Sequence, residues 1–304
     1  MSSVGLVLLC LAAAVPAGAQ VDDRLEVYTG RNASGYLAPL VDAFRSNLNS
    51  GLFHHARVER DGFHVSLELN VMSTFFGEES RSFLAVTESG FSPERYVEAP
   101  TVIGDPNAVF VTGNAATMFA FPGGFDVDNM YLSCPQLRIG SWKGTEAVGR
   151  LILYDTGSSD VGRLGVWGAG VRHSLSQYFA GLAPVDLAVA GMWQHAQLHN
   201  DADLDVIDSE LFTLALHSGV ALGSLYPYAG LAIDWYRFDV HYEVDGTAPV
   251  DLAFRANEDL QLTLGVSYRV GFAAAYGEYN IADQNSLAAG LSASFPFSSR
   301  SVTQ

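Results

Sequence analysis

Residues 260–270 read LQLTLGVSYRV, and this stretch decides the fold. Every second position is apolar, and the positions between them carry polar side chains or glycine; the apolar set is Leu260, Leu262, Leu264, Val266, Tyr268 and Val270. A period of two is typical of a β-strand with one face in an apolar medium and the other in water. A tilted strand needs about nine to eleven residues to cross a bilayer, so we expect this stretch to span a membrane.

The same alternation recurs along the chain. We expect strands at 63–71, 136–143, 146–154, 163–174, 185–198, 211–222, 228–244, 272–281 and 287–297, with weaker ones at 83–88 and 107–112. The pattern predicts an all-β chain that forms a transmembrane antiparallel β-barrel of about twelve strands, with one N-terminal helix. The alternative is a soluble secreted β-sandwich, in which the same apolar side chains would lie buried between two sheets.

One of these segments does not keep a single phase. Within 228–244 the apolar positions change phase between Trp235 and Tyr236. Such a change requires either a β-bulge or a strand that continues past the membrane, and the sequence leaves both open.

The N-terminal region divides into two parts. Residues 1–19 contain an apolar core followed by AGA at 17–19, which predicts a secretory signal peptide, although no Lys or Arg precedes the core. Residues 20–60 form a lead-in and an amphipathic helix over 32–50, whose apolar side chains recur every three or four residues. This helix either plugs the barrel lumen or forms a lid outside it. The barrel itself is expected over 61–304.

Three connections and the C-terminal strand stand out. Residues 89–129 are rich in proline and glycine without clean periodicity, which predicts a constriction-type loop folded into or over the barrel. The acidic segments 199–209 and 245–251 are expected as external loops. The closing strand ends at Phe297 and resembles the terminal signal through which the barrel-assembly machinery recognises outer-membrane barrels, although residues 298–304 follow it.

Composition excludes one class of partner. The chain has 304 residues with a formal net charge of −17, and it offers no basic stripe for nucleic acid. The expected partner is outer-membrane lipid. Cys10 lies within the signal peptide, so Cys134 alone remains in the mature chain and no intrachain disulfide can form.

Motifs for catalysis or metal binding are incomplete. The DTGSS at 155–159 resembles half of an aspartic-protease site, but no second such motif supplies the paired carboxylate. The acidic run from 201 resembles a calcium loop, yet Val206 and Phe212 occupy the positions that need Gly and Glu. His217 on an inward face would suit a lipid-modifying enzyme, but no serine is assigned to it. We expect no catalytic residue, no metal and no cofactor.

Several stretches resemble one bacterial family. They are ASGY at 33–36, NLNSGLFH at 47–54, PQL at 135–137, GTEA at 144–147 and GAGVRHS at 168–174. The family is an uncharacterised one of predicted secreted or outer-membrane β-barrel proteins, and the resemblance implies topology without catalytic residues. In overall style the chain is also similar to outer-membrane transporters of long-chain fatty acids, without a specific shared motif.

These features predict a barrel in the outer membrane of a Gram-negative bacterium, acting as a channel or carrier for small or apolar solutes. The polar phase of the strands supplies the residues expected to line its lumen: Glu68, Asn70, Arg172, Gln261, Thr263, Ser267 and Arg269. The alternatives are a structural or adhesive barrel with a closed lumen and a membrane-embedded lipid-modifying enzyme. The sequence specifies neither the solute nor the oligomeric state.

Overall fold

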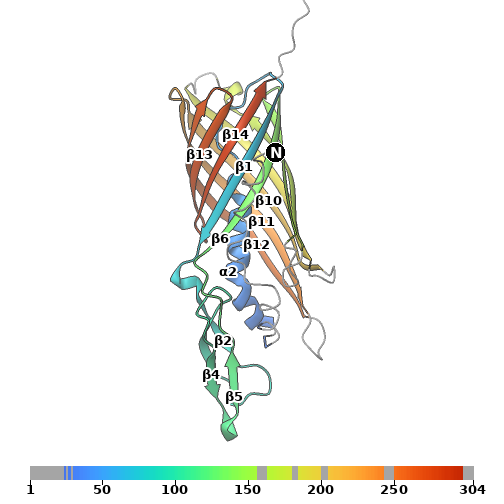
Figure 1. Cartoon of the computed structure of the whole chain (residues 1–304), viewed down its shortest axis with the longest axis vertical. Helices are drawn as coiled ribbons and strands as arrows, with labels where there is room; N and C mark the ends of the chain where they lie inside the picture. The colour runs from blue at the N-terminus through green and yellow to red at the C-terminus, as the bar shows by residue number, and fades with distance from the viewer. Residues whose placement is uncertain are drawn as a thin grey trace, which may run out of the picture.

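Ten strands form a closed antiparallel barrel (Figure 1). The computed structural model describes residues 24, 27–28, 30–155, 163–179, 184–199, 205–242 and 250–296, so the predicted signal peptide lies outside the described residues. Around the barrel, the strands follow the order β1 (His64–Phe75), β14 (Ser286–Pro296), β13 (Ala273–Ile281), β12 (Val250–Val270), β11 (Leu225–Tyr242), β10 (Asp205–Val220), β9 (Val185–His199), β8 (Arg163–Ser174), β7 (Thr145–Asp155) and β6 (Asn129–Trp142).

The predicted count of about twelve strands is therefore not what the barrel contains. The two segments in excess, 83–88 and 107–112, correspond to strands outside it. β2 (Ser82–Val86) pairs with β3 (Tyr96–Pro100), and β4 (Val109–Thr112) pairs with β5 (Met118–Phe121). Each of these strands finds its backbone partner a few residues away along the chain, so nothing requires it to join the wall.

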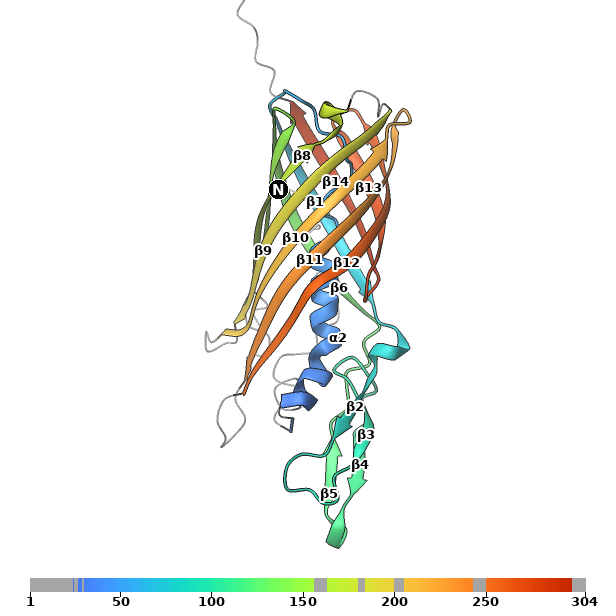
Figure 2. The ribbon, with the colours of Figure 1, turned by 180° about the vertical axis from the view of Figure 1, so that it is seen from behind.

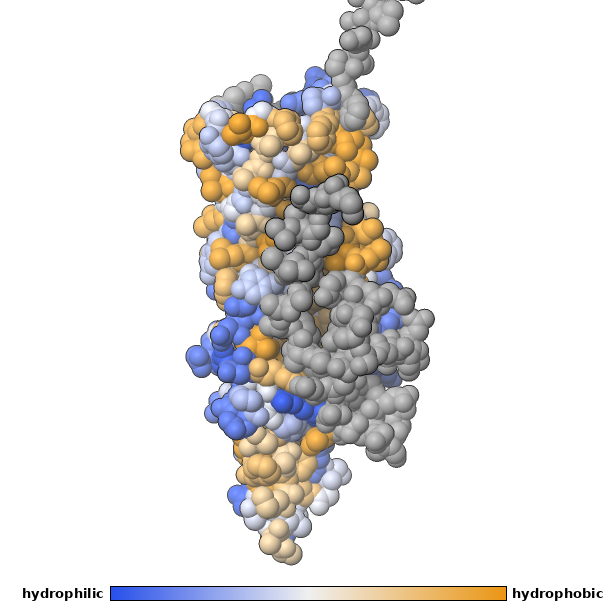
Figure 3. All heavy atoms as spheres, in the orientation of Figure 1, coloured by the Kyte–Doolittle hydropathy of each residue, from blue (hydrophilic) through white to orange (hydrophobic). Residues whose placement is uncertain are grey.

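The barrel wall turns its apolar side chains outward. On β12, Leu260, Leu264 and Val270 are 58%, 49% and 62% exposed. Gln261 and Thr263 on the same strand are 4% and 6% exposed. Apolar residues also cover much of the barrel surface in Figure 3. This inverted burial excludes the soluble sandwich, in which the apolar face would be the hidden one.

The two ends of the barrel differ. At one end, which we call the turn end, short connections join β6 to β7, β10 to β11 and β12 to β13; Gly223 and Gly271 adopt left-handed conformations there. The other end, which we call the loop end, carries the long connection between β1 and β6 (Figure 2). The predicted loop 199–209 is shorter than expected because β10 begins at Asp205, and β12 begins at Val250 within the predicted loop 245–251.

The phase change predicted in 228–244 has a visible cause. The pairing of β11 with β12 shifts register between Asp234 and Trp235. Both strands are also long, with 18 and 21 residues, so they extend past their neighbours toward the loop end (Figure 2).

Helix α2 (Gly30–Asn49) enters the barrel from the loop end (Figures 1 and 2). It begins two residues before the predicted start and ends one residue before the predicted end. Residues 50–63 continue to the turn end, where β1 begins, and we call residues 30–63 the plug segment. The short helices are η1 (Glu78–Ser80), η2 (Asn114–Ala116) and η3 (Ser176–Tyr178). No described helix is long and apolar enough to cross a membrane.

Residues 76–128 form a projection that extends away from the loop end (Figures 1 and 2). Its base packs on the start of α2. The Tyr28 and Tyr36 rings lie 5.3 Å apart, Phe121 lies against Tyr28, and the Val102 amide donates to the Tyr36 carbonyl at 2.9 Å. Most of the predicted loop 89–129 belongs to this projection, so it lies beyond the barrel end.

The exposure of the apolar face of β12 leads to a prediction about the stability of arginine variants. We expect Leu264→Arg to lower the free energy of unfolding by about 2–4 kcal/mol, because it places a charge in the hydrocarbon. Val270→Arg, on the same face at the strand end, should cost about 0–1 kcal/mol. Denaturant titration of each variant in lipid vesicles measures the two losses. Equal losses in the free energy of unfolding would contradict the placement of Leu264 deeper in the membrane than Val270.

Candidate functional site

The inward side chains of the barrel form a polar lining. Of the seven residues predicted to line the lumen, six are buried: Glu68, Asn70, Arg172, Gln261, Thr263 and Ser267. The seventh, Arg269, is exposed at the turn end. Four of the six, Glu68, Asn70, Arg172 and Gln261, bond to the plug segment. Thr263 bonds to Asn280 of the wall, and Ser267 lines a cavity at the turn end. Their role as a path for solute stays a prediction.

A buried ion-pair network centres on Glu68 of β1. Its carboxylate pairs with the Arg138 guanidinium and lies 3.0 Å from His54 Nε2. The Gln136 amide donates to its second oxygen at 2.6 Å. Arg138 also donates to His55 Nε2 at 2.8 Å, so that nitrogen is an acceptor and the His55 ring is neutral. The network joins β1 and β6 to the plug segment.

A second ion pair lies beside it. Arg172 of β8 pairs with Glu146 of β7 and donates to the carbonyl of His55. Glu146 also lies 3.3 Å from His64 Nε2. Buried charges of this kind are tolerated only when they are paired and hydrogen-bonded, and here the plug segment supplies part of the pairing.

The carboxyl end of α2 is held by strand side chains. Arg150 of β7 donates to the carbonyls of Leu48 and Ser50, both at 2.9 Å, and Gln194 of β9 donates to Leu48 at 3.0 Å. The last carbonyls of a helix have no partner within the helix, and its C-terminus attracts positive charge. An arginine at this position therefore satisfies both needs.

The chain turns sharply after the helix. Gly51 has φ +64°, and a Cβ on it would lie 2.8 Å from the Tyr276 hydroxyl, so only glycine fits. Its amide donates to Glu278 at 2.6 Å, and its carbonyl accepts from Asn70 at 3.1 Å. Tyr228 donates to the same Glu278 at 2.8 Å. Side chains of β1 and β13 thus bond to Gly51 directly, and Tyr228 of β11 bonds to the Glu278 carboxylate that does so.

Arg45 anchors the helix near the loop end. It pairs with Asp259, with Asp234 at 3.4 Å and with Asp283 at 3.5 Å. Burial raises the pKa of the Asp42 carboxyl, one helical turn earlier. Asn49 adds a hydrogen bond to Asp234 at 2.8 Å. Carboxylates from three separate stretches thus hold the same helix.

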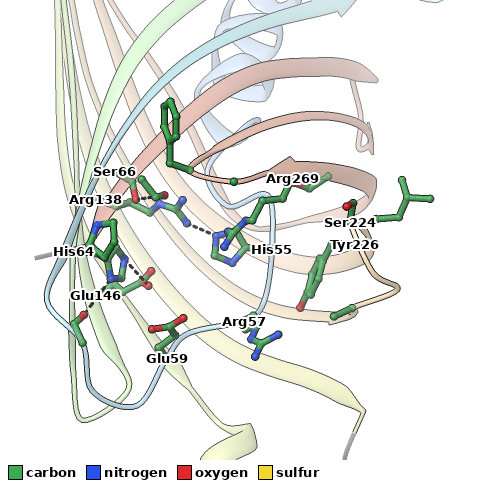
Figure 4. Close-up of a pocket in the computed structure, with 18 of the residues that line it drawn as sticks. His55, Arg57, Glu59, His64, Ser66, Arg138, Glu146, Ser224, Tyr226 and Arg269 are labelled. Carbon is green, nitrogen blue, oxygen red and sulfur yellow. Dashed lines mark hydrogen bonds and ion pairs between the residues drawn. The ribbon is translucent and has the colours of Figure 1, made fainter. Parts of the chain in front are cut away.

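A cavity lies at the turn end, where the plug segment leaves the lumen (Figure 4). His55, Arg57 and Glu59 reach it from the plug segment, and Arg138, Glu146 and Arg269 from the wall.

The enzymatic alternative finds little support at His217. This ring is 6% exposed and lies 5.3 Å from the Phe53 ring. Neither of its nitrogens has a hydrogen-bond partner among the described residues. Within the same part of the chain, no group of three or more His, Cys, Asp or Glu side chains is placed to hold a metal ion.

Most of the network was missed from the sequence. The strands at 136–143 and 146–154 were predicted, and Gln136, Arg138, Glu146 and Arg150 occupy their polar phase. A charged residue flanked by apolar neighbours in an alternating strand is the signal that finds them. The plug residues that meet them carry no comparable signal, because a helical stripe does not specify its partner.

A family model described as a family of unknown function, DUF6588, matches residues 1–295. The chain belongs to this family. No curated protein matches it. Solved structures with a similar fold include the outer-membrane protease OmpT from Escherichia coli, at 8% identity and TM-score 0.37, covering 79% of this chain and 98% of that one.

Two others are the transport unit of the autotransporter AIDA-I from Escherichia coli and the toluene transporter TbuX from Ralstonia pickettii. The first is 8% identical with TM-score 0.33, covering 89% of this chain and 100% of that one. The second is 9% identical with TM-score 0.28, covering 78% and 90%. At these scores the likenesses carry no argument about the activity of this chain.

The Glu68–Arg138 pair gives a prediction. Glu68→Gln leaves a buried guanidinium without its carboxylate, and we expect a loss of about 3–5 kcal/mol in the free energy of unfolding. Adding Arg138→Gln should recover part of that loss, which a double-mutant cycle measures.

The exposed pair of Arg81 with Asp126 is the control. Asp126→Asn should change the free energy of unfolding by less than about 1 kcal/mol. A cost at Glu68 no larger than at Asp126 would contradict a structural role for the buried pair.

Proposed function

We propose that this family member is an outer-membrane barrel that keeps its lumen closed and carries the projection on the outer surface of a Gram-negative cell. The contacts of the plug segment support a closed lumen most directly. Its residues bond to side chains of β1, β6, β7, β8, β9, β10, β11, β12, β13 and β14. A segment with bonds to every strand of the wall leaves little lumen for solute.

The orientation follows from the two ends. Outer-membrane barrels have short turns in the periplasm and longer loops outside the cell. The turn end would then face the periplasm and the projection would face outward. Barrel assembly through the closing strand stays part of this proposal; its last residue, Phe297, lies outside the described residues.

The surface of the projection supports a role in contact with other molecules. Leu84, Tyr96, Phe110 and Met118 are 57%, 57%, 63% and 65% exposed on it. Apolar side chains gathered outside the membrane are typical of interaction surfaces. A structural or adhesive role therefore suits the projection better than transport does.

The orientation makes a labelling prediction. With a membrane-impermeant maleimide on intact cells, we expect Glu94→Cys in the projection to react and Phe179→Cys at the turn end to react only after permeabilisation. Cys134 is 1% exposed, so the parent protein should give a low background. Labelling of Phe179→Cys alone on intact cells would reverse the orientation.

A gated channel is the second candidate, because polar bonds rather than an apolar core hold much of the plug segment in the barrel. Arg45 of the helix pairs with Asp259, and Arg150 of β7 donates to the carbonyl of Leu48 at the carboxyl end of the same helix. If those bonds act as a gate, weakening them opens a path.

Planar-bilayer recordings separate the two functions. We expect the full-length protein to show no steady conductance, and Arg45→Gln/Arg150→Gln to show openings because its helix is less firmly held. The mobility shift of heated and unheated samples in detergent gels checks that the variant barrel remains folded. Frequent spontaneous openings of the unaltered protein would favour the channel and contradict the closed lumen.

A further inference from the structure

The cavity at the turn end has the volume of a ligand site. It measures about 650 Å³ (Figure 4). Sites for small organic ligands fall at about 300–1,000 Å³. It is lined by polar side chains from the plug segment and several strands, among them His55, Arg57, Arg138, Tyr226, Ser267 and Arg269.

Part of the charge around the cavity is already neutralised. Arg138 pairs with Glu68, and Glu146 pairs with Arg172. Glu146 also contacts His64. The charges of these two arginines and two glutamates therefore cancel.

Two arginines remain. Arg57 and Arg269 line the cavity without an ion-pair partner among the residues the structure describes, although the chain as a whole carries −17. The Glu59 carboxylate lines the same space and offsets one of the two positive charges. Tyr226 lines the same cavity, beside the two arginines in Figure 4. An anion that enters therefore meets a net positive charge divided between two guanidinium groups.

The backbone beneath Arg269 is fixed. Its amide donates to the Ser224 carbonyl at 2.9 Å, which ties the β12 end to the β10–β11 turn. Gly223 and Gly271 allow both turns to be tight, with φ +65° and +60°. Arg269 and Tyr226 therefore lie on two strand ends that a backbone hydrogen bond joins.

Apolar side chains line part of the same cavity. Phe63, Leu225 and Phe272 line it and are 56%, 48% and 64% exposed. A ligand that filled the cavity would meet cationic groups with one end and apolar surface with the other.

We propose that this cavity binds an organic anion: a carboxylate or phosphate group on an apolar body. Arg57 and Arg269 bind the anionic group, and Phe63 and Phe272 contact the apolar part. The cavity exists with the plug segment in place, so this binding requires no opening of the lumen. It goes beyond the closed-lumen function and is tested separately from it.

The experiment is calorimetric titration of the full-length protein in nanodiscs of zwitterionic lipid. The probes are phenyl phosphate, inorganic phosphate as the anion alone, and benzyl alcohol as the uncharged ring. We expect phenyl phosphate to bind more tightly than either. No binding of phenyl phosphate overturns the proposal, and binding no tighter than that of inorganic phosphate overturns the apolar part of it.

Variants assign the binding to the two arginines. Arg57→Gln and Arg269→Gln should each weaken phenyl phosphate binding about tenfold, and Arg269→Lys should weaken it less because it keeps the charge. Arg255→Gln is the matched control, since Arg255 is exposed on the same strand toward the loop end. Equal weakening by Arg255→Gln, or none by Arg269→Gln, would overturn the site. Heat-dependent gel mobility verifies folding of each variant.

The ligand has two candidate sources, a lipid headgroup and a free solute. Repeating the titration in nanodiscs with phosphatidylglycerol distinguishes them. Loss of phenyl phosphate binding would support the lipid as the competing anion, whereas unchanged binding would support a soluble anion. Conductance and surface labelling are independent of both results, so failure of this site would leave the closed lumen standing.

Discussion

The structure depends on one constraint: charges turned into the barrel must find partners there. The outward face meets hydrocarbon, so the alternation of the strands places arginines and glutamates inside. Arg138 and Arg172 are 2% and 0% exposed, and neither could persist alone at that depth. Carboxylates on neighbouring strands neutralise them, while an imidazole and a carbonyl of the plug segment accept further hydrogen bonds from them.

The plug segment also carries polar groups that need partners inside the barrel. A helix that ends inside a barrel leaves carbonyls without partners, and residues 50–63 run through the lumen without regular structure. Arg150 and Gln194 satisfy the helix end, and Glu278 and Asn70 satisfy Gly51. Wall and plug are therefore each incomplete without the other, which explains why the lumen is filled by polar bonds and only in part by apolar packing.

The molecule has three regions that differ in chemistry: the wall with its plug segment, the projection and the turn end. The wall and the plug segment form one body that ion pairs and hydrogen bonds hold together. The projection adds apolar surface beyond the loop end, anchored through Tyr28 and Tyr36 to the start of the same helix. At the turn end, Arg57 and Arg269 line the cavity and have no ion-pair partner in the described part of the chain. The two ends thus offer different chemistry to whatever approaches them.

The sequence by itself determined the barrel class and most of the wall strands, because a side-chain period of two is local and one phase had to face hydrocarbon. It also determined the phase change near Trp235, which the register shift at Asp234 accounts for. It did not determine the number of strands in the wall, because the alternation of a short hairpin such as β4–β5 looks the same inside or outside a barrel. Nor did it determine that Glu68 would meet Arg138, or that Arg150 would meet the end of α2. Those partners are separated by 70 and about 100 residues, and only closure of the sheet around the threaded segment brings them together.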